Sequence, residues 1–164
     1  MALTRSGRAE TRSVLAVARI DRTRTIAAAP QEVWEVLADF GALSTWVDRV
    51  DHSCILVHGT DGHIGTSRRV QIGRQTLVER IVDWDPPHTL AYDIGGLPKV
   101  LHWVNNRWTL RPSGESTVVT LTSTVEIGSG RIRQLAERVV CRVMTRESDG
   151  LLGGLARRLE NSRA

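Results

Sequence analysis

Apolar residues recur at helical spacing in the segment that follows Pro30. The recurring positions, which would share one face of a helix, are Val33, Trp34, Leu37 and Phe40. Pro30 itself suits the first turn of a helix, where its missing N–H is not needed. The pattern therefore predicts an amphipathic helix over residues 31–39. A glycine then interrupts it, and a second short segment with an aromatic tip is predicted over residues 43–46.

Most of the remaining chain shows the shorter apolar period of β-strands, separated by turns that contain glycine or proline. Strands are predicted over residues 14–26, 51–58, 66–72, 75–84, 89–94, 102–111 and 117–126. The consecutive hairpin-type connections after residue 51 imply an antiparallel meander. Arg19, Arg22 and Arg24 interrupt the apolar pattern of the first strand, which favours an edge position for it in the sheet.

From residue 131 the apolar spacing becomes helical again and continues for about 30 residues. A helix of this length must lie across the sheet to bury its apolar side. Gly150, Gly153 and Gly154 interrupt the helix and are expected to mark a kink or a close approach to the sheet. The order of one strand, two short helices, six strands and one long helix predicts an α+β fold.

Two parts of the chain resemble one known superfamily. The stretch from Thr25 to Trp46, with its strand, proline-started helix and glycine break, resembles the START-like (SRPBCC) superfamily, and specifically its bacterial polyketide cyclase/dehydrase-like branch. The hairpin that carries Gly65, Arg68 and Glu79 before an Asp-Pro corner is similar to that branch in outline. The element order agrees over about residues 15–160. The resemblance implies a helix-grip fold, in which a curved antiparallel sheet of about seven strands wraps around the long helix and encloses an apolar cavity.

A charged pair on one predicted hairpin is the strongest candidate for a site. If Gly73-Arg74 is a two-residue turn, Arg68 lies opposite Glu79 on the face that also carries apolar side chains. A buried Arg–carboxylate pair is costly to desolvate, which makes it a candidate for binding a polar ligand group. The alternative is a structural cross-strand pair that fixes the register of the hairpin.

Strand alternation adds three polar candidates that would point inward, namely Tyr92, His102 and Asn106. With Arg68 stabilising an enolate and His102 or Glu79 moving protons, this set would suit a reaction on a polyketone. The alternatives are a core-filling role for Tyr92 and an exposed position for His102. Trp46 and Trp103 are expected at the open end of the meander, where aromatic side chains suit an apolar ligand.

The net charge of +4 is unevenly distributed. Residues 1–24 and 130–164 each carry +4, and residues 25–129 carry −4. We predict that residues 13–164 form a single domain preceded by a basic tail, residues 1–12. No aromatic residues interleave with the terminal arginines, so nucleic acid is not an expected partner. No metal-site spacing, phosphate loop or nucleophile motif is present, and neither a metal nor a cofactor is expected.

The sequence contains no apolar run of the length that spans a membrane, which predicts a cytoplasmic protein. We expect it to bind a hydrophobic or amphipathic small molecule, such as a polyketide, lipid or isoprenoid-like compound. An enzyme of the polyketide cyclase/dehydrase type and a non-catalytic lipid or quinone carrier are both consistent with this expectation. A third alternative is an interaction module whose basic ends contact RNA, a protein or an anionic membrane surface. A homo-oligomer is compatible with the sequence.

Overall fold

The computed structural model describes residues 16–60, 62–128 and 133–162. The predicted basic tail, residues 1–12, and the first two residues of the predicted first strand lie outside the described residues. The elements are β1 (Ala16–Ile26), α1 (Pro30–Ala38), the 3-10 helix η1 (Phe40–Thr45), β2 (His52–Val57), β3 (Ser67–Ile72), β4 (Gln75–Asp85), β5 (Thr89–Gly95), β6 (Leu101–Ser113), β7 (Ser116–Ile127) and α2 (Arg133–Asn161). Each predicted element is present, with its ends shifted by a few residues at most.

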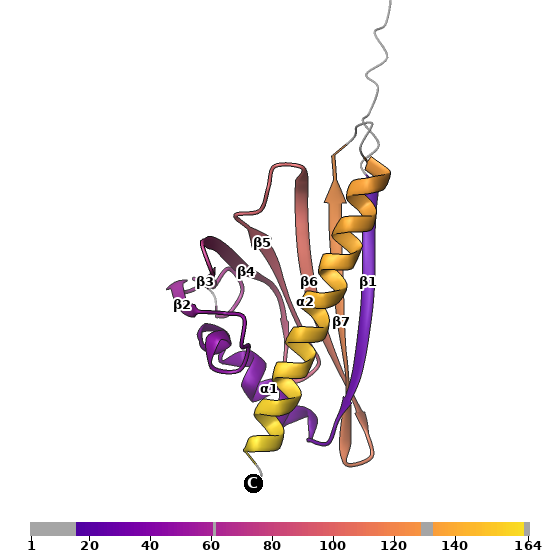
Figure 1. The fold of residues 1–164 in the computed structure, drawn as a ribbon. Helices are drawn as coiled ribbons and strands as arrows, with labels where there is room; N and C mark the ends of the chain where they lie inside the picture. The colour runs from indigo at the N-terminus through magenta and orange to yellow at the C-terminus, as the bar shows by residue number, and fades with distance from the viewer. Residues whose placement is uncertain (1–15, 61, 129–132, 163–164) are drawn as a thin grey trace, which may run out of the picture.

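The strands form one antiparallel sheet of seven, in the order β1-β7-β6-β5-β4-β3-β2. The strands from β2 to β7 follow one another as a meander, and β1 pairs with β7 at the edge. The long helix α2 runs diagonally across one face of the sheet, and α1 lies beside its C-terminal end (Figure 1). This arrangement confirms the predicted helix-grip fold. In the described part of the chain, no helix combines the length and apolar character needed to cross a bilayer.

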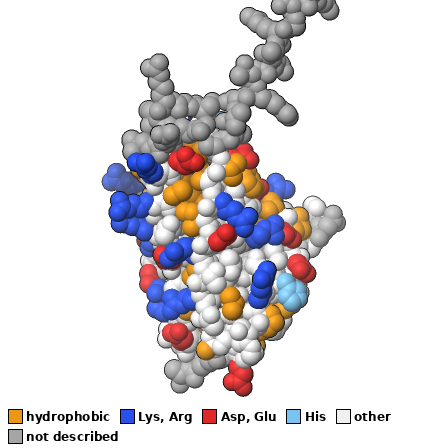
Figure 2. Space-filling view, turned by 90° about the vertical axis from the view of Figure 1, so that its right-hand side faces the viewer, with side chains coloured by type: hydrophobic (Ala, Val, Ile, Leu, Met, Phe, Trp, Pro, Cys, Tyr) orange, Lys and Arg blue, Asp and Glu red, His pale blue; other side chains and the backbone are white. Residues whose placement is uncertain are grey.

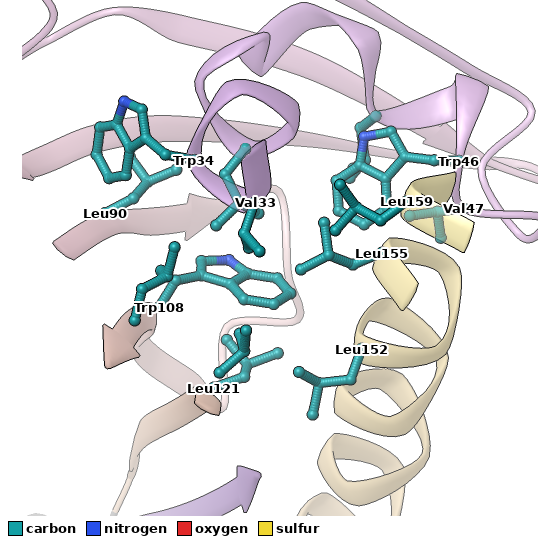
Figure 3. Close-up of a cluster of buried hydrophobic side chains, with 14 of the residues drawn as sticks. Val33, Trp34, Trp46, Val47, Leu90, Trp108, Leu121, Leu152, Leu155 and Leu159 are labelled. Carbon is teal, nitrogen blue, oxygen red and sulfur yellow. The ribbon is translucent and has the colours of Figure 1, made fainter. Parts of the chain in front are cut away.

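The main hydrophobic core occupies the end of the molecule where α1, the sheet and the C-terminal half of α2 meet. Figure 3 shows Trp108 and Leu121 of the sheet facing Leu152 and Leu155 of α2, with Val33 of α1 beside them. All of these side chains are buried. The apolar spacing of α1 places its buried face toward this cluster. The C-terminal half of α2 is therefore fixed by core packing.

The arginine-rich strand β1 forms one edge of the sheet, as predicted, and β2 forms the other. On the face of the molecule shown in Figure 2, basic and acidic side chains are interspersed. Arg22 reaches from β1 to Asp149 of α2 with two hydrogen bonds of 2.7 and 3.0 Å. Charged side chains along an edge strand discourage its pairing with another chain.

The glycines of α2 do not have the predicted effect. They were expected to mark a kink or a close approach to the sheet, but α2 is one continuous helix from Arg133 to Asn161. Gly154 does mark a close approach, but to the backbone of Trp46, which follows η1, and not to the sheet. A methyl group at Gly154 would lie closer to the Trp46 carbonyl oxygen than real Cβ atoms ever do. By contrast, nothing lies within 4 Å of a Cβ placed at Gly150.

We expect Gly154→Ala and Gly150→Ala to change stability in opposite directions. Gly154→Ala forces two backbone segments apart, so the free energy of unfolding should fall by about 1–3 kcal/mol. Gly150→Ala, four residues away in the same helix, should raise it by up to about 1 kcal/mol because alanine favours the helix. Urea denaturation of the two variants measures both effects. Equal stability of the two variants would contradict the close approach at Gly154.

Candidate ligand-binding site

A cavity of about 490 Å³ lies between the sheet and the N-terminal half of α2. Most of its wall is apolar, and the contributing side chains include Val70, Leu77, Ile94, Val125, Val140 and Met144. Four polar side chains of the sheet and α2 line the cavity and are buried, namely Glu79, Asn106, Ser123 and Ser148. The end of α2 that does not pack on the main core thus covers a cavity instead.

Exposed residues show where the cavity opens. Val139 and Val143 of α2 line it and are 55% and 51% exposed. Arg49 and Arg157 line it as well: Arg49 forms an ion pair with Glu147, and Arg157 forms one with Asp48 at 2.8 Å. These pairs link the segment after η1 to α2. They are largely exposed, so we assign them little effect on stability.

The β3–β4 hairpin has the predicted register, with Arg68 directly opposite Glu79. The two residues are 3% and 5% exposed. Arg68 donates from Nε to Glu79 Oε2 at 2.6 Å, and its Nη2 lies 2.5 Å from the same oxygen. The pair is thus a buried salt bridge in which both contacts end on one carboxylate oxygen.

The guanidinium of Arg68 is enclosed by protein on its other sides. Its Nη1 donates to the Phe40 carbonyl oxygen at 2.7 Å. Its Cζ lies 3.9 Å from the centre of the Phe40 ring and 5.0 Å from that of Tyr92. Arg68 does not line the cavity, whereas Glu79 does. These contacts compensate the charge of Arg68, and only the carboxylate of the pair reaches the cavity.

A row of polar side chains crosses the inner face of the sheet from β5 to α2. Ser123 donates to Asn106 Oδ1 at 2.7 Å, and its Oγ lies 3.2 Å from Ser148 Oγ. Asn106 Nδ2 lies 3.4 Å from the Tyr92 hydroxyl, to which it donates. Through Asn106, Ser123 and Ser148, this row adds buried polar groups to a cavity whose wall is mostly apolar.

Two members of this row, Ser123 and Ser148, were missed by sequence reasoning. Ser123 continues the inward alternation of β7 between two buried apolar residues, Leu121 and Val125. Ser148 is buried on the side of α2 that also carries Met144. A polar residue that interrupts an apolar stripe was the available signal in both cases.

The phenol of Tyr92 is fully buried beside the charged pair. Burial raises its pKa above the ordinary value, and the negative charge of Glu79 acts in the same direction. Arg68 and hydrogen bonds from Asn106 and Trp108 oppose the shift without cancelling it. Tyr92 therefore keeps its proton at neutral pH and acts as a neutral hydroxyl.

The sequence contains one tyrosine, so phenolate absorbance reports on Tyr92 alone. Because the pKa is raised in the folded state, the stability that this group provides is present below about pH 10 and is lost as pH rises through the folded pKa. We expect the native protein to show no phenolate at about pH 10, where the urea-unfolded protein is half ionised. Tyr92→Phe supplies the blank. A half-maximal phenolate signal at that pH with native circular dichroism would contradict the described burial.

The family model described as polyketide cyclase / dehydrase and lipid transport matches residues 17–160. The chain belongs to this family. No curated protein matches the sequence of this cyclase/dehydrase family member.

Solved structures show the same fold. The Zhui aromatase/cyclase from Streptomyces sp. R1128 is 24% identical, with a TM-score of 0.66 over 88% of this chain and 96% of that one. A START superfamily protein from Mycobacterium smegmatis is 16% identical, with a TM-score of 0.69 over 87% and 97% of the two chains. The di-domain ARO/CYC StfQ of the steffimycin biosynthetic pathway is 17% identical, with a TM-score of 0.75 over 90% of this chain and 52% of StfQ. At these identities the likeness establishes the helix-grip fold of the family member.

Five of the seven predicted site residues do not line the cavity of this family member, namely Arg68, Tyr92, His102, Trp103 and Trp46. His102 is exposed, because a register shift between Leu101 and Trp103 makes it the extra residue of a bulge. Trp103 is 39% exposed and donates from Nε1 to Asp93 Oδ1 at 3.0 Å, on the outer face of the sheet. Trp46 is buried against Leu159 and Val47 in the main core (Figure 3). The expectation that the tryptophans form an aromatic rim is therefore wrong.

The structure brings four of the predicted residues together. Arg68, Glu79, Tyr92 and Asn106 lie on neighbouring strands of the inner face, and Glu79 and Asn106 line the cavity. Among the described residues, no three His, Cys, Asp or Glu side chains gather as a metal site would require. The chemistry that this arrangement offers is hydrogen bonding and proton transfer in an apolar enclosure.

Proposed function

We propose that the protein binds a hydrophobic or amphipathic small molecule in the cavity beneath α2. The observation that carries this proposal is a cavity of about 490 Å³ with an apolar wall and one polar row. Cavities of this size and lining suit small-molecule ligands, with the few polar groups fixing the orientation. The polyketide, lipid and isoprenoid-like classes all have this character. Membership of the polyketide cyclase / dehydrase and lipid transport family, together with the likeness to the Zhui aromatase/cyclase and the ARO/CYC StfQ, supports the polyketide class.

If the protein acts on its ligand, Glu79 is the candidate proton acceptor, since it is the charged residue buried at the cavity wall. Asn106 and Ser123 are candidates to hydrogen-bond a carbonyl or enolate oxygen. Arg68 is then a positioning residue, because it contacts Glu79 and not the cavity. In this proposal a reaction of the cyclase or dehydrase type depends on cavity shape together with one carboxylate.

A non-catalytic carrier is the second candidate function. The placement of His102 and Arg68 favours it, because the predicted partners of Glu79 in proton transfer and enolate stabilisation do not line the cavity. The two candidate functions are distinguished by incubating the ligand with the protein and analysing it by liquid chromatography with mass spectrometry. A carrier returns the ligand unchanged, whereas a cyclase returns a cyclised isomer or its dehydrated product, and a dehydrase returns a product that has lost water.

The binding proposal is tested with the neutral apolar dye N-phenyl-1-naphthylamine, whose fluorescence rises in an apolar site. We expect saturable binding with one dye per chain, and displacement by linear and polycyclic aromatic polyketides. Weak non-saturable fluorescence at many sites would contradict the proposal. Displacement by fatty acids but not by polyketides would favour the lipid class.

A further inference from the structure

The carboxylate of Glu79 has one oxygen that the protein does not use. Both contacts with Arg68, at 2.6 and 2.5 Å, end on Oε2. Among the residues that the structure describes, none donates a hydrogen bond to the side-chain oxygen Oε1. A carboxylate oxygen has room for two donors, so Oε1 remains a strong and unused acceptor.

This oxygen is accessible from the cavity. In the described part of the chain, Trp46 Nε1 is the one fully buried side-chain nitrogen or oxygen without a partner. Glu79 Oε1 also lacks a partner, but it is not fully buried. It therefore remains in contact with accessible space. Since the Glu79 side chain is 7% exposed and lines the cavity, that space is the cavity.

We propose that Glu79 Oε1 is the anchor for a neutral hydroxyl group of the ligand, such as a phenol, an enol or an alcohol. This inference rests on the proposed function and names the ligand chemistry at that site. A carboxylate accepts hydrogen bonds and cannot donate them, so the ligand atom it meets must carry a proton. A bond of this kind, to a charged acceptor, is among the stronger hydrogen bonds in proteins.

The neighbouring charge of Arg68 selects a neutral donor over a cation. The salt bridge already neutralises the carboxylate, and the guanidinium packs against the rings of Phe40 and Tyr92. An ammonium group would lose its hydration on entering the apolar cavity and would meet a pair with no net charge. A hydroxyl group loses far less on desolvation and gains the same acceptor.

Two probes, one with and one without a hydroxyl donor, test the proposal: 2-naphthol and its methyl ether, 2-methoxynaphthalene. By titration calorimetry we expect the wild-type protein to bind 2-naphthol about tenfold more tightly or better. In Glu79→Gln, Arg68 retains the amide oxygen, so the amino group faces the cavity and cannot accept the naphthol proton. The preference should then fall to about twofold or less. Glu115→Gln, a carboxylate-to-amide change in the exposed β6–β7 turn, should keep the full preference.

If Glu79→Gln does not fold, the double variant Arg68→Met with Glu79→Leu provides a second protein that lacks the carboxylate. Replacing a buried ion pair by apolar residues of similar volume is often tolerated. This variant should bind both probes with similar affinity. Equal binding of the probes by the wild type, or a preference that survives in Glu79→Gln or the double variant, overturns the hydroxyl anchor alone. Failure of the wild type to bind either probe or the dye overturns the proposed function and the anchor with it.

Discussion

Replacing Arg68 alone by methionine is expected to lower the free energy of unfolding by about 3–5 kcal/mol. The loss follows from what remains after the substitution. Glu79 stays 5% exposed at the wall of an apolar cavity, with no cation beside it. An unpaired buried charge costs more than the pair itself contributes. Urea denaturation followed by tryptophan fluorescence measures the change.

The double variant Arg68→Met with Glu79→Leu is the matched control for this loss. Because both charges are removed together, its stability should return to within about 1 kcal/mol of the wild type. The recovery from the single to the double variant then measures the coupling between the two residues. A single variant as stable as the wild type would contradict the buried salt bridge.

Substituting tryptophan for Leu77 is expected to abolish binding of the apolar dye. Leu77 is half-buried on β4 and lines the cavity, so a larger ring at this position occupies the ligand's space. Excluding even part of a ligand from an apolar site removes several contacts worth about 0.8 kcal/mol per buried CH₂ group. We therefore expect affinity to fall by about 100-fold or more. The dye titration described above measures the loss.

Val78→Trp is the control for this substitution. Val78 is the next residue of the same strand, is 41% exposed and faces away from the cavity. Dye affinity in this variant should stay within about twofold of the wild type, since strand alternation places the new ring on the outer face. If Leu77→Trp bound the dye as well as Val78→Trp, the dye would not occupy the cavity.

The sequence was sufficient to predict the elements and the register of the hairpin that carries the salt bridge. A two-residue turn at Gly73-Arg74 leaves one pairing that keeps the apolar side chains on one face, and this pairing places Arg68 opposite Glu79. The same alternation correctly placed Tyr92 and Asn106 on the inner face. Period-2 patterns are reliable where a strand continues without interruption.

The errors arose where the backbone departs from this regular alternation. The bulge in β6 pairs Leu101 with Ile127 and Trp103 with Glu126, which leaves His102 outside the cavity. No feature of the local sequence indicates that the strand contains a bulge at this position. Trp46 was misplaced for a different reason, since its position depends on the close approach of Gly154, more than 100 residues later in the chain. Such long-range contacts are not encoded in a local pattern.

The sequence also could not show whether a ligand in the cavity can contact Arg68. Register predicts that Arg68 and Glu79 share a face, but not which of the two reaches the cavity. That depends on the carbonyl oxygen of Phe40, which accepts from Nη1, and on the rings that enclose the guanidinium. The tertiary structure was therefore needed to show that Glu79 is the partner that lines the cavity.

The central claim, that the cavity holds a small apolar molecule, is tested most directly by native mass spectrometry of the protein isolated from the cells that naturally produce it. We predict one bound molecule per chain, released on denaturation and identified as an apolar compound with a hydroxyl group. Leu77→Trp expressed in the same cells should be empty, and Val78→Trp should be loaded. A wild-type protein that is empty on isolation, and stays empty after exposure to lipid and polyketide mixtures, would contradict the account.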